Sequence, residues 1–322
     1  MRILVTGGAG FIGSNLVESL LQRPEVEKVR VLDNLATGSA ENINEFQSHS
    51  RFEFIEGDIR NFETCLRACD GIDLISHQAA LGSVPRSIND PLTSNEVNVT
   101  GTLNIFTAAK DKSVKRVVYA ASSSTYGDHP DLPKVEDKIG NPLSPYAVTK
   151  YVNELYARVY ANVYGLETIG LRYFNVFGPK QNPQGAYAAV IPLFIKAVLD
   201  NEPPLINGDG EHSRDFTYVA NAVHANEAAL FSQNKEAVNQ VYNIAFGEQT
   251  SLNELFQTIK EIAGSDLAAK YGPERAGDVK HSLADISKAK TFLGYNSAVN
   301  VRDGLKEAFE WYRRRHNYSY SI

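Results

Sequence analysis

A glycine-rich turn near the start of the chain constrains the fold more than any other feature. Gly7, Gly10 and Gly13 recur at every third position, directly after the apolar run 3–5 and at the start of a helical pattern that extends to about residue 21. Glycines at this spacing permit a tight turn and let backbone N–H groups approach a pyrophosphate at the N-terminus of a helix. The turn therefore predicts a strand–helix unit that binds a dinucleotide.

Short apolar runs alternate with helical patterns along the first half of the chain. We expect long helices over 92–110 and 145–164, and strands at 29–32, 52–55, 72–76, 116–120, 168–172 and 241–245. This alternation predicts an α/β fold with a doubly wound parallel sheet. The pattern loosens after Asn175, which indicates a smaller C-terminal substrate domain. We expect residues 1–174 and about 214–249 in the nucleotide-binding domain, and residues 175–213 and 250–322 in the substrate domain.

Composition restricts the classes of partner. The 322 residues carry a formal net charge of −6, which argues against a nucleic-acid partner. No apolar stretch reaches the roughly 18 residues of a transmembrane helix, so we expect no membrane span. Cys65 and Cys69 have no accompanying His/Cys cluster, so we expect no metal site. Two reduced thiols without a disulfide framework are typical of a cytoplasmic protein.

A carboxylate follows the second expected strand, where a dinucleotide would place its adenosine ribose. Asp33 stands 20 residues after Gly13. It can accept hydrogen bonds from the ribose hydroxyls and would repel a 2′-phosphate, which favours NAD over NADP. The alternative role for Asp33 is a helix cap or turn residue. Asp58 ends the third strand, where it either meets the adenine amino group or is an exposed loop acid.

A tyrosine and a lysine one helical turn apart form a candidate acid/base pair. Tyr146 and Lys150 share one face of a helix. A phenol has a pKa of about 10, but a nearby ammonium and the positive nicotinamide ring both favour the phenolate. Ser122, Ser123 and Ser124 follow the strand at 116–120, at the sheet edge where α/β folds bind ligands. Taken alone, a Tyr/Lys pair at this spacing is common on exposed helices, and serine-rich loops are frequent. The combination of both features downstream of a glycine turn is much rarer.

These motifs together resemble the extended short-chain dehydrogenase/reductase family and, within it, the nucleotide-sugar 4-epimerases. The resemblance covers essentially the whole chain and also rests on His77–Ala80, Tyr126-Gly127, Arg172–Asn175, Ser213–Phe216 and Arg275-x-Gly277-Asp278. It implies a Rossmann domain, a homodimer and a catalytic set of Ser122, Tyr146 and Lys150. It further implies an NAD site formed by Gly7, Gly10, Phe11, Ile12, Gly13, Asp33, Asn34, Gly38, Asp58, Ile59, Gln78, Ala80, Asn98, Tyr146, Lys150 and Tyr173.

Members of this family share a first step, oxidation at C4 to a 4-keto sugar, and then diverge. The resembling dehydratases carry an Asp-Glu pair where Ser123 and Ser124 stand, and decarboxylases carry Glu at Ser124. No carboxylate is present at these positions here. We therefore expect return of the hydride to the opposite face, which is epimerisation with NAD regenerated. A dehydratase, another enzyme modifying nucleotide sugars, and a silent NAD-sensing regulator are the alternatives.

The resemblance also suggests the sugar. Members restricted to glucose and galactose carry a bulky Tyr at the position of Ser282, so Ser282 leaves space for an N-acetyl group. We expect interconversion of UDP-N-acetylglucosamine and UDP-N-acetylgalactosamine, with the plain UDP-hexoses as further substrates. Arg214 and Arg275 are candidate diphosphate anchors, unless they form surface ion pairs with Asp215 or Asp278. The implied substrate site comprises Gly82, Ser83, Ser122, Ser123, Tyr146, Asn175, Ala189, Val190, Asn207, Arg214, Arg275, Asp278 and Ser282.

Overall fold

A parallel sheet forms the larger part of the protein. The computed structural model describes residues 1–183, 189–274 and 280–319. Within them, seven strands lie in the order β11-β6-β5-β4-β1-β2-β3. All neighbouring strands in it run parallel, which confirms the predicted fold class. The strands are β1 (Arg2–Thr6), β2 (Lys28–Asp33), β3 (Phe52–Glu56), β4 (Leu74–His77), β5 (Arg116–Ser122), β6 (Glu167–Tyr173) and β11 (Gln240–Ile244).

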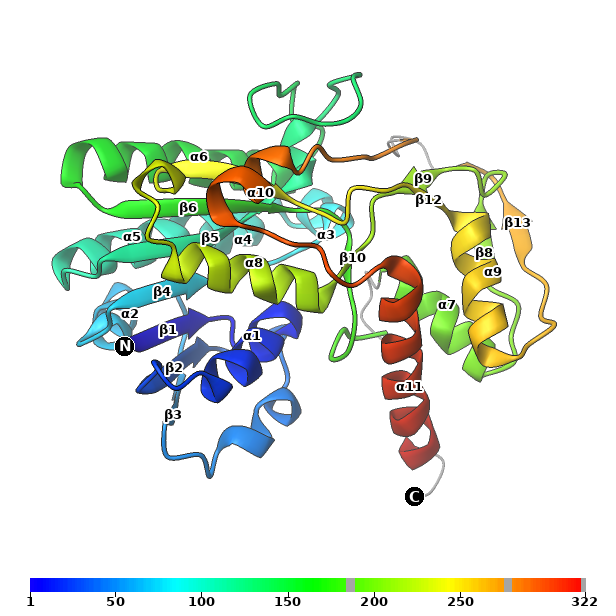
Figure 1. The fold of residues 1–322 in the computed structure, drawn as a ribbon, viewed down its shortest axis with the longest axis horizontal. Coiled ribbons are helices and arrows are strands. Elements are labelled where there is room, and N and C mark those ends of the chain that lie inside the picture. The colour runs from blue at the N-terminus through cyan, green and yellow to red at the C-terminus, as the bar shows by residue number, and fades with distance from the viewer. Residues whose placement is uncertain (184–188, 275–279, 320–322) are drawn as a thin grey trace.

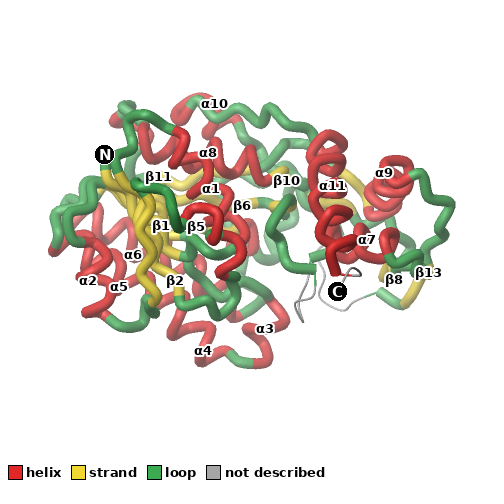
Figure 2. The backbone as a smooth tube through the Cα atoms, turned by 90° about the horizontal axis from the view of Figure 1, so that it is seen from below, coloured by secondary structure: helices red, strands yellow, loops and turns green. Residues whose placement is uncertain are grey.

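Helices cover both faces of this sheet, as Figures 1 and 2 show from two directions. One face carries α1 (Phe11–Gln22) and α8 (Val219–Phe231); the other carries α2 (Phe62–Cys69), α5 (Gly101–Asp111) and α6 (Pro145–Tyr164). Successive side chains of a strand point to opposite faces. Accordingly, Ile3 and Val5 of β1 join the core under α1, whereas Leu4 joins the core under α2 and α5.

The two long helices predicted from sequence have different outcomes. Helix α6 spans the predicted range, because Ser144 caps its first turn by accepting a hydrogen bond from the Ala147 N–H and left-handed Gly165 ends it. The segment predicted as one helix over 92–110 is instead α4 (Pro91–Asn95), a π-helical turn over Glu96–Thr100, and α5. The single-helix prediction is therefore wrong at residues 96–100.

The C-terminal part forms a smaller group of elements beside the sheet, to the right in Figure 1. Its helices are α7 (Val190–Leu199), α9 (Leu252–Ala263) and α11 (Val301–Ser319), while α10 (Ser287–Leu293) lies against β11. Three short strand pairs accompany them: β8 (Leu205–Asn207) with β13 (Lys270–Gly272), β9 (Ser213–Arg214) with β12 (Thr250–Ser251), and β7 (Val176–Phe177) with β10 (Thr217–Tyr218). The chain enters this group after β6, returns to the sheet for α8 and β11, and leaves it again.

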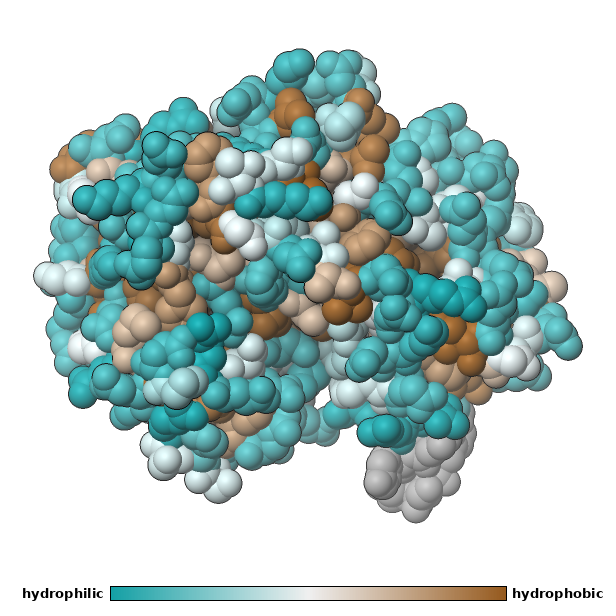
Figure 3. Space-filling view, in the orientation of Figure 1, coloured by the Kyte–Doolittle hydropathy of each residue, from teal (hydrophilic) through white to brown (hydrophobic). Residues whose placement is uncertain are grey.

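The face of the protein drawn in Figure 3 is mainly polar. Hydrophilic residues cover most of the face in Figure 3, with separate apolar patches between them. Among the described helices, none has both the length and the apolar character required to cross a membrane.

Candidate active site

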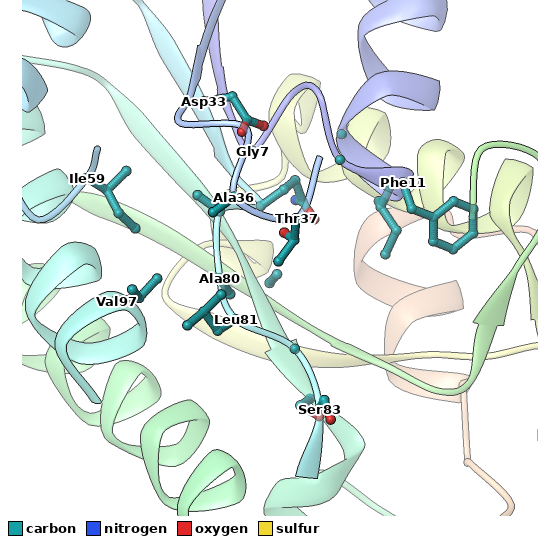
Figure 4. A pocket seen from close by; sticks show the side chains of 18 of the residues that line it. Gly7, Phe11, Asp33, Ala36, Thr37, Ile59, Ala80, Leu81, Ser83 and Val97 are labelled. Atoms are coloured by element: carbon teal, nitrogen blue, oxygen red, sulfur yellow. The ribbon is translucent and has the colours of Figure 1, made fainter. Parts of the chain in front are cut away.

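A cavity of about 640 Å³ opens along the carboxyl ends of the central strands. It is lined by the glycine turn, the ends of β2 and β3, the loop after β4, the end of β5 and the start of α6. In Figure 4, Asp33 and Ser83 lie far apart, with Ala80 and Leu81 on the loop between them. The carboxyl edge of a parallel sheet is where open α/β folds bind their ligands.

The glycine turn leaves no room for side chains. A Cβ on Gly13 would lie 2.1 Å from the Gly7 carbonyl oxygen, and one on Gly7 would lie 2.7 Å from the Ala79 nitrogen. Gly7 also has a positive φ of 69°, which favours glycine. Gly10 precedes α1 and provides no capping side chain, so the first N–H groups of the helix stay available for an anion. This cradle fits the pyrophosphate of a dinucleotide.

Asp33 ends β2 on the cavity wall and is only 8% exposed. Its carboxylate accepts hydrogen bonds from the Ala9 N–H (2.9 Å) and the Leu35 N–H (2.8 Å), so it also holds the glycine turn. Burial raises the pKa of Asp33 despite these backbone donors. A buried carboxylate with unused lone pairs gains from further donors, and the two hydroxyls of a ribose would supply them.

Asp58, Asn34 and Arg60 form a polar cluster at the end of β3. The Asn34 Nδ2 donates to Asp58 Oδ2 (2.9 Å), and the Arg60 guanidinium forms an ion pair with the same oxygen (2.7 Å). The hydrogen bond from Arg60 is the main reason that the pKa of Asp58 falls to about 2. All three residues line the cavity. Arg60 was not expected from the sequence, although its position two residues after Asp58 is a signal for such a pair.

A buried amide holds the tyrosine at the end of β6. The Asn226 Nδ2 donates to the Tyr173 hydroxyl (2.7 Å), which donates to Gln78 Oε1 (3.2 Å). Asn226 lies on α8 and is fully buried, whereas Tyr173 and Gln78 line the cavity. The bonds hold the Tyr173 hydroxyl in place beside Gln78 on the cavity lining, and contact of Tyr173 with the cofactor stays a prediction.

The predicted catalytic residues meet at one end of the cavity. Ser122, Tyr146 and Lys150 all line it. Lys150 is 4% exposed, donates from Nζ to the Ala120 carbonyl oxygen (2.8 Å), and lies 5.9 Å from the centre of the Tyr146 ring. Burial lowers the pKa of Lys150 to about 8. Burial also raises the pKa of Tyr146, and a hydrogen bond with Ser122 opposes that shift.

The direction of the Tyr146 shift qualifies the sequence argument. Lys150 was expected to stabilise the phenolate, but in the protein alone burial outweighs the groups that favour ionisation. The nicotinamide ring of NAD would add a positive charge at this site that favours the phenolate.

Several predicted substrate residues lie on the same cavity wall, namely Gly82, Ser83, Ser123, Asn175 and Ala189. A Cβ added to Gly82 would meet nothing within 4 Å, so the wall is open there. Ser83 has a φ of 127°, and such strain in a side chain-bearing residue is typical of binding sites. Ala189 is the N-cap of α7 and Val190 is its first residue, and no side chain caps this end of the helix. Phe11, Ile12, Ile59 and Ala80 of the predicted cofactor set also line the cavity.

Three other predicted substrate residues lie in the C-terminal part and are not among the described residues that line the cavity, namely Asn207, Arg214 and Ser282. The Ser282 N–H donates to the Ser213 carbonyl oxygen (3.1 Å), and the neighbouring Arg214 donates to the Lys280 carbonyl oxygen (3.1 Å). Asn207 ends β8 and pairs with Gly272. Asp215 is fully buried and accepts from the N–H groups of Phe246, Gly247 and Ala284. Arg275 and Asp278 lie outside the described residues.

Two residues predicted to bind the cofactor lie behind the cavity wall. Asn98 is fully buried in the π-helical turn, accepts from the Leu81 N–H (2.8 Å) and donates to the Leu81 carbonyl oxygen (3.1 Å). It therefore positions the loop that lines the cavity. Gly38 packs against the Ala9 backbone, which a Cβ would approach to 2.7 Å. Sequence reasoning missed Gln181, a lining residue in the turn-rich segment after Asn175 whose polar composition was its signal.

Comparison with known proteins identifies the family. Residues 3–245 match the NAD dependent epimerase/dehydratase family. A putative UDP-glucose 4-epimerase of Methanocaldococcus jannaschii is 39% identical over 311 residues, 96% of this chain and 97% of the relative.

Two solved structures share the fold across nearly the whole chain. The UDP-N-acetylglucosamine 4-epimerase of Methanobrevibacter ruminantium, in complex with UDP-N-acetylmuramic acid, has a TM-score of 0.91, 39% identity and 98% coverage of each chain. The UDP-glucuronic acid 4-epimerase of Bacillus cereus, with UDP-glucuronic acid and NAD, has a TM-score of 0.90 and 33% identity, with 98% of this chain and 100% of that chain covered. The predicted resemblance and the predicted cofactor are thereby confirmed, and the chain belongs to the NAD-dependent epimerase/dehydratase family.

Proposed function

We propose that the protein interconverts UDP-N-acetylglucosamine and UDP-N-acetylgalactosamine at C4, and also accepts UDP-glucose and UDP-galactose. The observation that carries this proposal is the meeting of Ser122, Tyr146 and Lys150 at one end of a cavity whose other end has the features of a dinucleotide site. Relatives that are similar over nearly the full length are named as 4-epimerases of different UDP-sugars, which supports the reaction class more strongly than the sugar.

The residues of the site divide the chemistry between them. The glycine turn and Asp33 would hold NAD, which would supply the hydride acceptor for C4 of the sugar and the donor for return to its opposite face. Tyr146 takes the proton of the C4 hydroxyl as the ketone forms and gives it back when the alcohol is restored. Lys150, charged below its pKa of about 8, supports the phenolate, and Ser122 donates a hydrogen bond at the same centre.

The described residues beside Ser122 favour epimerisation over dehydration, because none of them is a carboxylic acid. Among the described residues that line the cavity, the only carboxylates are Asp33 and Asp58, which lie at the ends of β2 and β3. A dehydratase needs a group that protonates the leaving hydroxyl, and Ser122, Ser123 and Ser124 supply no carboxylic acid. The described lining therefore supports reduction of the ketone and supplies no carboxylic acid beside the serines for elimination.

The first experiment separates the class of reaction from its alternatives. Purified protein is incubated with UDP-N-acetylglucosamine and, separately, with UDP-glucose, and the products are identified by NMR. We expect the C4 epimer in both tubes, faster in the first, and no net NADH. A 4-keto-6-deoxy product would establish a dehydratase, and stoichiometric NADH a dehydrogenase. A silent regulator would give no product, and Tyr146→Phe would then leave its biological effect unchanged.

The preference for an N-acetyl group rests on the small side chain of Ser282, where the resembling glucose- and galactose-restricted enzymes carry Tyr, and on the open wall beside Gly82. We expect Ser282→Tyr to suppress turnover of UDP-N-acetylglucosamine while it spares UDP-glucose, because the added ring fills the region of the acetamide. Ser282→Ala is the matched control and should convert both sugars. Unchanged N-acetylhexosamine turnover in Ser282→Tyr would contradict the assignment of this residue.

We also propose a division of the chain into two domains and its assembly into a homodimer. The elements support a nucleotide-binding domain of residues 1–174 and about 214–249, and a substrate domain of residues 175–213 and 250–322. A homodimer would cover the apolar stripe on α6 formed by Val148 (48% exposed), Leu155 (41%), Val159 (48%) and Val163 (65%). The thiols of Cys65 and Cys69 are free and buried, which suits a cytoplasmic location.

A further inference from the structure

The turn after β5 contains a hydroxyl that the proposed chemistry does not yet use. Ser124 belongs to the 3₁₀ turn Ser123–Tyr126, directly behind Ser122. Ser122 and Ser123 line the cavity, whereas Ser124 is absent from the described lining residues. The side chain of Ser124 instead faces Ser122: its Oγ donates to Ser122 Oγ at 2.9 Å, and its backbone N–H donates to the same atom at 3.2 Å.

These two bonds determine what Ser122 can still do. A serine hydroxyl has one proton to donate and two lone pairs that accept. Ser124 occupies both lone pairs of Ser122, so the remaining capacity of Ser122 is the donation of its own proton. Donation to an oxygen also strengthens the O–H of the acceptor as a donor, because hydrogen bonds in a chain polarise one another.

The turn that carries Ser124 is held firmly. The Gly127 N–H donates to the Ser124 carbonyl oxygen (3.1 Å), and Thr125 and Tyr126 are buried. The Tyr126 hydroxyl donates to Asn243 Oδ1 (2.6 Å) on β11, and the Arg172 guanidinium lies 4.8 Å from the centre of the Tyr126 ring. Arg172 is itself fixed by Glu154, through bonds of 2.8 and 2.7 Å. These contacts hold the turn, and with it the Ser124 hydroxyl, in a fixed position.

We propose that Ser124 is a positioning residue which holds Ser122 as a hydrogen-bond donor, so that its single proton is donated to the Tyr146 phenolate and, once Tyr146 is protonated, to O4 of the bound sugar. This inference rests on the proposed function. With its lone pairs filled, Ser122 does not receive the proton of the C4 hydroxyl. That proton passes directly to the Tyr146 phenolate as the C4–H bond breaks and the electron pair leaves with the hydride to NAD, and both return in the reverse step. Ser122 keeps its proton throughout and stabilises the oxygen on which charge develops.

The test compares Ser124→Ala with Ser124→Thr in the NAD-loaded enzyme, on whichever of the two UDP-sugars the wild type converts. Ser124→Ala removes the hydroxyl donor and keeps the backbone donor, so we expect kcat to fall about fivefold, the change that corresponds to one neutral hydrogen bond, with KM unchanged. The acid limb of the kcat profile should move to higher pH, because Ser122 becomes a weaker donor to the phenolate. Ser124→Thr retains a hydroxyl and should restore both.

A double-mutant cycle shows whether Ser124 acts through Ser122. In a Ser122→Ala background, the change Ser124→Ala should have no further effect on kcat. Equal losses in both backgrounds, an unchanged kcat, or a loss confined to KM would each overturn the proposal. Failure of the proposed function is distinguishable, because the wild type would then give no epimer from either sugar.

Discussion

Lys150, the buried lysine beside Tyr146, is expected to lower the stability of the folded protein while it supports catalysis. Lys150 is 4% exposed, and burial lowers its pKa from the usual 10.5 to about 8. At about 1.4 kcal/mol per pKa unit, this shift means that the charged form of Lys150 lowers the free energy of unfolding by about 3 kcal/mol. Lys150→Met eliminates this penalty and loses the hydrogen bond to the Ala120 carbonyl, which contributes about 1 kcal/mol. We expect the variant to be inactive and about 2 kcal/mol more stable at pH 7.

The stability difference between Lys150→Met and the wild type should decrease as pH rises. The folded-state pKa of Lys150 lies below the unfolded one, so between pH 8 and pH 10.5 the unfolded chain binds more protons. Wild-type stability therefore gains from this group as pH rises through that window, and the penalty is fully present below it. The advantage of Lys150→Met should shrink to below about 1 kcal/mol at pH 9.5, where Lys150 is largely neutral in the folded protein.

Equilibrium urea unfolding of protein freed of nucleotide measures both quantities. Exposed Lys115→Met is the control, since it removes a lysine outside the buried site and should show a stability difference that does not change between pH 7 and pH 9.5. A variant at position 150 that is no more stable than wild type at pH 7, or an advantage that is independent of pH, would refute the reasoning.

Two further predictions test the cofactor cradle and the assembly. Gly13→Ala places a Cβ 2.1 Å from the Gly7 carbonyl oxygen, so NAD affinity measured by calorimetry should fall at least about tenfold. The circular dichroism spectrum should stay that of the folded protein. Unaltered affinity would contradict the assignment of the glycine turn as the NAD site. Val159→Asp places a charge in the exposed apolar stripe of α6, and light scattering after gel filtration should show monomers. The control Leu193→Asp on α7 should leave the proposed dimer intact. A dimer in both variants would exclude the α6 stripe as the dimer interface.

Local sequence signals were sufficient for the sheet and for the residues at its carboxyl edge. The turn at Gly7, the strand ends at Asp33 and Ser122, and the helical spacing of Tyr146 and Lys150 are each set within a few residues of the chain. The structure brings all of them to one cavity, because parallel strands present their carboxyl ends on the same edge.

The remaining features depend on contacts between segments that are distant in sequence. The π-helical turn around Asn98 satisfies the backbone of Leu81, 17 residues away, and periodicity alone gives no sign of it. The full burial of Asp215 depends on backbone donors near residues 246 and 284. The raised pKa of Tyr146 likewise follows from burial, which the spacing of Tyr146 and Lys150 does not reveal.

The central claim is that the hydride removed from C4 returns to the same sugar. The most direct measurement uses UDP-N-acetylglucosamine deuterated at C4, incubated with the purified protein in ordinary water, with mass spectrometry of the separated epimers. We predict that UDP-N-acetylgalactosamine forms with its C4 deuterium retained, and that unlabelled substrate in deuterated water gains no deuterium at C4. Loss of the label to solvent, or a product with an altered carbon skeleton or oxidation state, would contradict the account.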